Sequence, residues 1–391
     1  LRNARRRVNL PVPVALNRLA AALRVFSLGI ALLVRAQTTR IRLDVPHHPM
    51  IRLLALTMLL WVASGCRAQE SPPPLESQRS ADVQQPLTHR LVAAPPAVTG
   101  RQPLLWVSLG AHLGARADAA PLTLTAASGS LSLEDRSGRR WSAASVQISW
   151  RSVPLEQPLA LARRVAGPFA SFESAERVAL RWRALGVAAE VAHPADWEVW
   201  APAGAPAPGD LPVRDWSTRL ESSVEPVLQL PEGGTTLTGP LQIDAPGGLR
   251  WGKGVFQGPF RLQRDAYGSW TLVEQVPLER YLEGVVPHEI GAGSPQAALQ
   301  AQTVLARTWA LANSHRFRID GYHLCSDTQC QVYSDPRQAG QAVRQAITAT
   351  QGRLLSWQGK PISAVYHATN GGVMAAGPEA WAMDAQPYLK A

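Results

Sequence analysis

The chain has 391 residues, enough for one or two domains with hydrophobic cores, and a formal net charge of +10. Most of that charge lies at the start, because residues 1–49 contain nine arginines and one aspartate. The remainder is close to neutral. A basic nucleic-acid-binding face on the folded part is therefore not indicated, and we expect no nucleic-acid partner.

A secretion signal occupies residues 50–66. It opens with Met50 and has one positive charge, a short apolar run and small residues before Cys66. The run is too short for a comfortable transmembrane helix. We therefore expect an exported protein of the periplasm or cell envelope. We interpret residues 1–49 as upstream sequence translated by mistake, with a cytoplasmic extension as the alternative.

The signal ends in ASGC at residues 63–66, which resembles the lipobox of bacterial lipoproteins, whose cysteine is acylated after cleavage. The position three before the cysteine is usually leucine but is Ala63 here, so ordinary cleavage without lipid is the alternative. We predict a lipid anchor on Cys66 that ties the chain to the membrane. Residues 67–103, rich in proline and polar residues, then form a linker.

Strand patterns follow the linker. Residues 104–150 alternate apolar and polar positions, which predicts a small antiparallel sheet. In residues 163–202 a capped amphipathic helix, closed by Gly186, lies between two strand-like runs. This βαβ pattern resembles a SPOR repeat, a module that binds glycan strands stripped of peptides. A purely structural insertion is the alternative, and we favour it over glycan binding.

The last part, residues 213–391, holds the candidate site. Ser294 is a good N-cap and Pro295 suits the first helical position, so a helix is predicted to start here. A second helix is predicted over residues 337–349, followed by a hairpin with a Gln358-Gly359 turn. The apolar side of the first helix is expected to consist of Leu299, Val304, Leu305, Trp309 and Leu311.

Five motifs occur in this part in order: LEGVVPHE at 282–289, ALQAQTVLARTWA at 298–310, CQVY at 330–333, ATQG at 349–352 and ATNGG at 368–372. Together they resemble the SpoIID/LytB family of bacterial cell-wall proteins, over roughly residues 230–391. With the patterns above, the resemblance predicts an α+β fold: a strand-rich body, a SpoIID-like catalytic domain over residues 213–391 and the inserted module. Family members usually continue further, so we expect the sequence to be incomplete at its C-terminus.

The resemblance implies a lytic transglycosylase that cuts peptidoglycan glycan strands between N-acetylmuramic acid and N-acetylglucosamine without water. One carboxyl group suffices. It protonates the glycosidic oxygen and then takes the proton of the sugar's own 6-hydroxyl, which closes an anhydro ring; ordinary glycosidases generally need two carboxylates. The family's catalytic glutamate falls on Glu289, and its apolar neighbours should keep it protonated near neutral pH: Val285, Val286, Pro287 and Ile290.

Other polar residues of these motifs are candidate sugar contacts. Arg307 either holds a sugar carboxylate in a bidentate contact or belongs to a buried ion pair, and both alternatives stay open. Gln331 and Tyr333 either donate hydrogen bonds to acetamido groups or close a loop. A polar strand end is predicted to supply further sugar contacts, and its glycines permit close approach of a glycan chain. Its candidate residues are His367, Thr369, Asn370, Gly371 and Gly372.

Cys325 and Cys330 lie close to His323 in one loop. Some relatives in the resembled family carry zinc here with an extra histidine. Gln329 stands at that position in this chain, which leaves three ligands where a structural zinc site needs four. A disulfide is the simpler arrangement in an oxidising compartment, so we predict the disulfide and no cofactor, with zinc and free thiols as the alternatives.

Two other functions compete with catalysis. The main alternative is a non-catalytic module that binds peptidoglycan and enhances a cell-wall amidase, as LytB-type members of the family are described to do. The other is a lipoprotein that only tethers the envelope. Glu289 favours an enzyme, because a protein that only binds glycan has no need of it.

Overall fold

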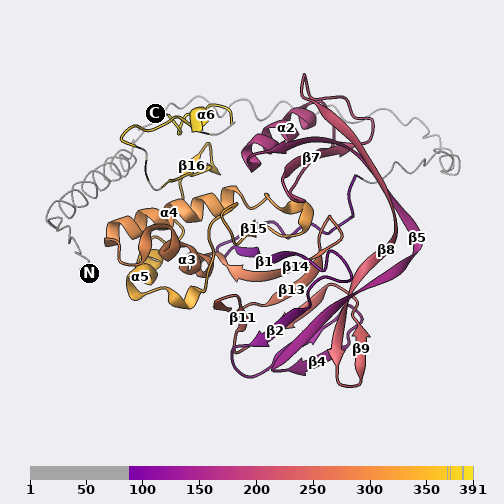
Figure 1. Cartoon of the computed structure of the whole chain (residues 1–391). Coiled ribbons are helices and arrows are strands. Elements are labelled where there is room, and N and C mark those ends of the chain that lie inside the picture. Colours follow the sequence, from indigo (N-terminus) through magenta and orange to yellow (C-terminus); the bar gives the residue numbers. More distant parts are fainter. Residues whose placement is uncertain (1–87, 368, 370, 381–382, 391) are drawn as a thin grey trace, which may run out of the picture. The chain divides into compact units, whose positions relative to one another are not determined.

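Two large β-sheets, a two-stranded sheet and a group of helices make up the part of the chain that the computed structural model describes, residues 88–367, 369, 371–380 and 383–390 (Figure 1). Residues 1–49, the predicted signal at 50–66 with Cys66, and most of the predicted linker lie outside these residues. Within the described part, no helix has the length and apolar character needed to span a membrane. The end of the predicted linker lies on the folded body, where the carbonyl of Pro103 accepts a hydrogen bond from Leu278 N at 2.9 Å.

The first sheet has the strand order β15-β1-β14-β13-β10-β3-β4. Its neighbouring strands are antiparallel, except that β1 and β15 run parallel. The strands are β15 (Leu324–Cys325), β1 (Leu104–Leu113), β14 (Trp270–Pro277), β13 (Phe260–Arg264), β10 (Leu241–Asp244), β3 (Leu131–Glu134) and β4 (Arg140–Ala143).

The second sheet has the order β12-β11-β2-β5-β7-β6, with β8 paired to β5 and β9 paired to β8. Its strands are β12 (Gly254–Phe256), β11 (Leu249–Trp251), β2 (Leu122–Ala126), β5 (Ser145–Phe169), β7 (Trp197–Pro202), β6 (Glu190–Ala192), β8 (Val213–Leu230) and β9 (Gly233–Thr236). The long strands β5 and β8 form a ribbon that curves from the region of β2 to the region of β7 and α2 (Figure 1).

The prediction that residues 104–150 form one small antiparallel sheet is wrong. Strands β1, β3 and β4 belong to the first sheet, whereas β2 and the start of β5 belong to the second. The reason is long-range pairing: β1 pairs with β14, and β3 pairs with β10. Alternation of apolar residues indicates that a strand has one buried face, but it does not indicate which distant strand lies beside it.

One cluster of buried apolar side chains joins both sheets to three helices, α3 (Leu278–Val286), α4 (Gln296–Ala312) and α5 (Gln341–Ala349). The cluster takes Leu124 from β2, Ile148 from β5 and Leu272 from β14. The remaining short helices are η1 (Pro287–Gly291), η2 (Arg318–Asp320), η3 (Pro336–Gln338) and α6 (Gly377–Ala380), and β16 (Ser356–Trp357) pairs with β17 (Lys360–Pro361). The α+β class predicted from the sequence is confirmed.

Helix α4 differs from its prediction in cap and buried face. The hydroxyl of Ser294 donates to the carbonyl of Ile290 at 2.7 Å, so Pro295 takes the N-cap position instead. Leu299 and Trp309 are buried as predicted, but Val304, Leu305 and Leu311 are only half-buried. The side that packs against the rest of the body instead carries small and polar residues, namely Thr303, Ala306, Arg307, Thr308 and Ala310.

The insertion at residues 163–202 consists of the end of β5, α2 (Phe172–Ala184), β6 and β7. Helix α2 begins after Ser171, whose hydroxyl accepts a hydrogen bond from Ser174 N at 3.2 Å. Strand β7 lies between β5 and β6 and is antiparallel to both, so β5 and β6 are parallel with a strand between them. The insertion is therefore a split βαβ unit.

Both faces of this small sheet are covered. Helix α2 packs on one face, where Val199 of β7 is buried. On the other face Trp200 packs with Ala266 and Ile319 of the body. The sheet therefore has no open apolar face at β7 for a glycan strand, and the resemblance to a SPOR repeat gains no support here.

We expect Trp200→Ala to lower the free energy of unfolding by about 3–5 kcal/mol, the usual cost of truncating a buried tryptophan. Trp200 is 1% exposed and joins the insertion to the body. Leu180→Ala in the same insertion is the control, because Leu180 is 53% exposed and surface changes usually stay within about 0.5 kcal/mol. Urea unfolding followed by circular dichroism and by tryptophan fluorescence should give one shared transition. Two separate transitions, with only one shifted by Trp200→Ala, would contradict the joint packing.

Candidate functional site

Glu289 lies in η1, a single π-helical turn that connects α3 to α4. Pro287 opens the turn directly after the last residue of α3. Gly291 closes it with a φ of 85°, a left-handed conformation that glycine adopts without strain. The turn leaves His288 exposed and Glu289 half-buried. The carboxyl group of Glu289 is thus held by a short backbone segment anchored in two packed helices.

Opposing effects set the pKa of Glu289. Burial raises this pKa above its ordinary value and is the largest effect. A hydrogen bond from the Tyr366 hydroxyl, one from the backbone N–H of Val332 and the nearby His288 lower it. The carboxyl is therefore partly removed from water, yet its ionised form keeps hydrogen-bond donors. Such a balance suits a group that releases a proton and regains it.

A chain of hydrogen bonds leads from the core to Glu289. The Tyr281 hydroxyl donates to Gln331 Oε1 at 3.1 Å, and Gln331 Nε2 donates to the Tyr366 hydroxyl oxygen at 2.9 Å. Tyr366 in turn donates to Glu289. Burial and the charge of Glu289 raise the pKa of Tyr366, so its hydroxyl keeps the proton that it donates. All donors point towards the carboxylate, so each bond polarises the next one.

Gly284 allows the loop that carries Gln331 to lie against α3. A Cβ atom at position 284 would lie 2.5 Å from the carbonyl oxygen of Ser334 and 2.5 Å from the ring of Tyr333. The Gly284 carbonyl accepts a hydrogen bond from Ser334 N at 3.1 Å. The glycine of the LEGVVPHE motif is therefore required by the close approach of residues 333–334.

Tyr333 is a core residue. It is buried, its ring stacks on Tyr281 with the centroids 5.0 Å apart, and its hydroxyl donates to Glu274 Oε2 at 2.9 Å. The sequence left two roles open for Tyr333, binding an acetamido group or closing a loop. This arrangement matches the second role, because the hydroxyl is already engaged with Glu274. Gln331 is 1% exposed, so it acts on the site through Tyr366.

The hairpin of β16 and β17 brings Tyr366 to Gln331. Leu355 N, just before β16, donates to Thr308 Oγ1 of α4 at 3.0 Å. The predicted turn is present, with φ of 49° at Gln358 and 75° at Gly359, as a two-residue hairpin turn of this kind requires. Tyr366 was not among the predicted site residues. Its only sequence signal is an aromatic residue beside His367, a pattern that core strands also have.

Arg307 belongs to a buried ion pair, which was one of its two sequence alternatives. It is 1% exposed, and its Nε and Nη2 donate to the two carboxylate oxygens of Glu279 at 2.9 and 2.7 Å. Its Nη1 lies 3.4 Å from both Thr350 Oγ1 and the carbonyl of Arg353. A buried guanidinium with these partners cannot also hold a sugar carboxylate.

The segment predicted to be a polar strand end follows Tyr366 at the surface, but the last strand of the described residues, β17, already ends at Pro361. His367 and Thr369 are exposed, and His367 Nδ1 donates to the carbonyl of Thr369 at 2.7 Å. Gly371 and Gly372 are exposed with φ of 64° and 99°. Asn370 lies outside the described residues. Contact between this segment and a glycan stays a prediction.

Cys325 and Cys330 form a disulfide. The neighbouring His323 is buried, and both of its ring nitrogens face the backbone: Nδ1 accepts from Trp106 N at 2.8 Å, and Nε2 donates to the carbonyl of Pro96 at 2.8 Å. His323 therefore fixes the start of the loop. Within the described ranges, no group of three or more His, Cys, Asp and Glu side chains is arranged to hold a metal ion.

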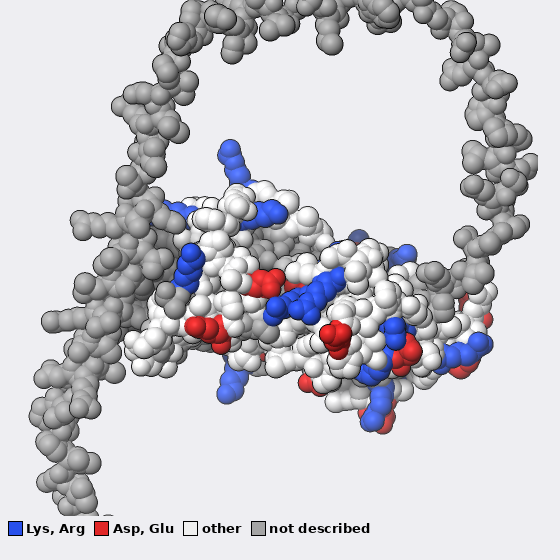
Figure 2. Space-filling model, turned by 90° about the horizontal axis from the view of Figure 1, so that it is seen from above, with Lys and Arg blue, Asp and Glu red and all other residues white. Residues whose placement is uncertain are grey.

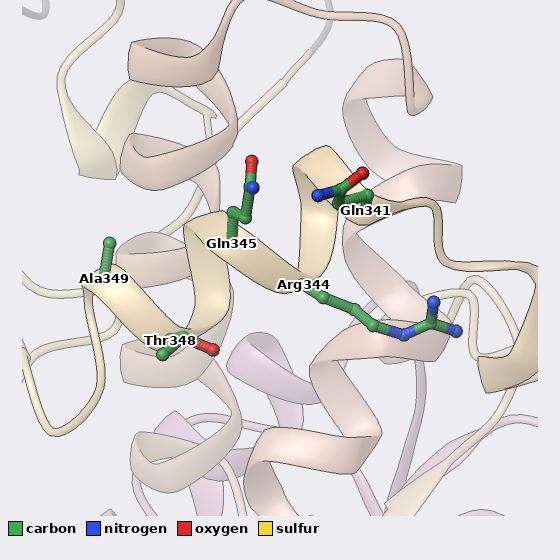
Figure 3. Close-up of a pocket in the computed structure, with 5 residues that line it drawn as sticks. All are labelled: Gln341, Arg344, Gln345, Thr348 and Ala349. Carbon is green, nitrogen blue, oxygen red and sulfur yellow. The ribbon is translucent and has the colours of Figure 1, made fainter.

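A pocket of about 410 Å³ lies elsewhere, on the outer side of α5 (Figure 3). Arg344 extends from this helix away from Gln345, and its Nε lies 3.6 Å from Glu283 Oε2. The groups that act on Glu289 are not among its lining residues, so we assign the site to the surface around Glu289. Acidic and basic side chains are interspersed on the face seen in Figure 2, which lacks a continuous basic area.

Comparisons with known proteins agree with the motifs. Residues 266–357 match the family described as SpoIID, Stage II sporulation protein. Stage II sporulation protein D of Bacillus amyloliquefaciens is 37% identical over 134 residues, 30% of this chain and 38% of that protein. The amidase enhancer of Bacillus subtilis is 36% identical over 108 residues, 28% of this chain and 14% of that protein. An uncharacterised protein of Brachyspira hyodysenteriae is 33% identical over 110 residues, 27% of this chain and 28% of that protein.

The matches cover well under half of each relative's length. The matched range of 266–357 contains Glu289, Arg307, Gln331 and the disulfide, and it ends before Tyr366. It is also shorter than the range of about 230–391 over which the motifs resemble the family.

We expect Arg307→Ala to lower the free energy of unfolding by about 3 kcal/mol, because Glu279 would lose its partner. This value is at the lower end for a broken buried pair, since the Glu279 side chain keeps 31% exposure. The double variant Arg307→Met with Glu279→Leu should recover most of the loss, because it removes both charges. Urea unfolding measures all three proteins. If Arg307→Ala keeps the wild-type stability but no longer binds glycan, Arg307 contacts the substrate and the ion-pair assignment is wrong.

We expect Tyr366→Phe to raise the pKa of Glu289. The lost hydrogen bond favours the ionised carboxylate, so without it the carboxyl keeps its proton to higher pH. Carbon NMR titration of labelled glutamates measures the change, with Glu289→Gln to assign the signal. Tyr388→Phe is the control, because that ring packs with Trp357 instead. A pKa of Glu289 that stays constant or falls would contradict the contact.

Proposed function

We propose that the chain remodels peptidoglycan and that glycan strands are its substrate, because residues 266–357 match the SpoIID family, described as Stage II sporulation protein. The finer proposal is a lytic transglycosylase with Glu289 as its general acid and base. One observation carries it: Glu289 is half-buried, with a raised pKa, and is hydrogen-bonded by Tyr366 and Val332. A raised pKa favours the protonated carboxyl, and a protonated carboxyl can donate a proton to a leaving oxygen.

The reaction needs one carboxyl group. Glu289 gives its proton to the oxygen between N-acetylmuramic acid and N-acetylglucosamine, the bond from that oxygen to C1 of the muramic acid breaks, and N-acetylglucosamine leaves. The 6-hydroxyl of the muramic acid then bonds to its own C1 and returns a proton to Glu289. No water is consumed, and the product ends in an anhydro ring.

The surroundings of Glu289 fit this scheme. Between the two proton transfers Glu289 is a carboxylate, which Tyr366 and the Val332 N–H stabilise. The described groups that shift its pKa are a tyrosine, a backbone amide and a histidine.

The second candidate function is a peptidoglycan-binding module that enhances a cell-wall amidase. The similarity of this chain to a protein named amidase enhancer favours it. In that case Glu289 would take part in binding without proton transfer. Under either function we propose that the chain is exported and held at the cell envelope by lipid on Cys66.

We expect Glu289→Gln to lower the rate of glycan cleavage by about 10²–10⁴-fold, because the amide keeps the shape but cannot transfer a proton. Mass spectrometry of purified glycan strands after digestion counts the anhydro-sugar ends. Glu283→Gln is the matched control from the same motif, since Glu283 pairs with Arg280 and Arg344 instead. Binding to strands should survive in both variants.

Cleavage by Glu289→Gln at the wild-type rate would exclude Glu289 as the catalyst. A wild-type protein that binds strands and stimulates a purified cell-wall amidase, without producing anhydro ends, would favour the enhancer.

A further inference from the structure

The insertion contacts the disulfide loop next to the candidate site. Trp197 of β7 is 2% exposed, and its Nε1 donates to the side-chain Oε1 of Gln329 at 3.0 Å. Gln329 lies inside the loop that the bond between Cys325 and Cys330 closes. A buried indole N–H without this acceptor would lose its hydrogen bond. The contact therefore ties the insertion to one residue of the loop.

Arg316 makes a second link to the same residue. Its guanidinium lies 4.3 Å from the ring centre of Phe172 and pairs with Glu173, and both residues are in α2. Its Nη1 also donates to the backbone carbonyl of Gln329 at 3.3 Å. Gln329 is thus held by its side chain through Trp197 and by its backbone through Arg316.

Aromatic packing makes this junction rigid. Trp197 lies 5.3 Å from Phe172 and 5.3 Å from Phe317, measured between ring centres, and Phe317 stacks on Tyr322 at 4.9 Å. The same apolar cluster includes Cys325. Close-packed rings in a core have few alternative positions, so a shift of the insertion would move the loop.

The loop continues directly into the groups that act on Glu289. Gln331 donates to Tyr366, and the backbone N–H of Val332 donates to Glu289. Tyr333 N donates to the carbonyl of Ser326 at 3.0 Å, which closes the loop behind Val332. A displacement of Gln329 therefore reaches Gln331 and Val332 through a short, closed segment.

We propose that the insertion braces this loop, and that Trp197 and Gln329 are positioning residues for Glu289. They act through the N–H of Val332 and the amide of Gln331, and they do not touch the substrate. The expected effect of these contacts on catalysis rests on the proposed function, whereas their role in holding the loop in place does not. The insertion would then contribute to the reaction although it lies in a separate part of the fold.

Gln329→Ala is the decisive variant, because Gln329 is exposed and its loss should leave the chain folded. Gln329→Glu keeps an oxygen acceptor for Trp197 and should behave like the wild type. Thr328→Ala is the matched control, an exposed neighbour in the same loop. Hydrogen–deuterium exchange of the peptide covering residues 326–333 should be faster in Gln329→Ala and unchanged in the other two.

Rates of glycan cleavage across pH test the positioning role. We expect Gln329→Ala to lower the maximal rate by up to about 10²-fold, the cost of a misplacement near 1 Å. The alkaline limb of the pH profile should move to higher pH, because the Val332 hydrogen bond lowers the pKa of Glu289 and the variant weakens that bond. A merely structural effect would reduce the amount of folded protein and leave the limb in place.

Unchanged exchange in Gln329→Ala would overturn the brace. Faster exchange with an unmoved alkaline limb would overturn the positioning role. Failure of the proposed function is distinguishable from both, because it appears as a wild-type chain without cleavage. In that case the pKa of Glu289 measured by NMR replaces the pH profile, and an unshifted pKa in Gln329→Ala counts against positioning.

Discussion

The side-chain amide of Gln331 is the contact on which the candidate site depends. An amide has both an acceptor and donors, and here the acceptor meets Tyr281 in the core while a donor meets Tyr366 near the surface. Glutamate at this position would lose the donor. Leucine would leave the buried hydroxyl of Tyr281 without a partner, at a cost of about 1–3 kcal/mol. The amide therefore links the packed core to Tyr366 and fixes the orientation of that side chain beside Glu289.

The body of the protein supplies this contact from several separate elements. Helix α3 carries Tyr281 and ends in the turn with Glu289. Gln331 follows the disulfide loop directly, and the hairpin after α5 leads to Tyr366. Each element is fixed elsewhere: α3 in the main core, the loop by His323 and the insertion, and the hairpin on α4 through Thr308. The site can therefore stay at the surface and still be held by rigid parts of the fold.

Local patterns predicted more of the fold than of the site. The α+β class, helix α2 with its cap and the Gln358-Gly359 turn follow from short-range chemistry, and the motif around Glu289 pointed to that residue. The division of strands between two sheets depends on partners far along the chain, such as β14 for β1, which alternation does not specify. Likewise, nothing in the sequence near Arg307 indicates that Glu279 faces it, and the half-buried Tyr366 has no pattern that separates it from a core tyrosine.

The disulfide between Cys325 and Cys330 affects when the protein can complete its maturation. It closes the loop just ahead of Gln331 and Val332. Thiols are kept reduced in the cytosol, and disulfides form in oxidising compartments outside it. On the proposed route, a newly made chain would reach the far side of the membrane with this loop still open and would complete it only there. The bond then couples formation of the site to export, because the surroundings of Glu289 reach their final structure only after the protein has left the compartment where it was made.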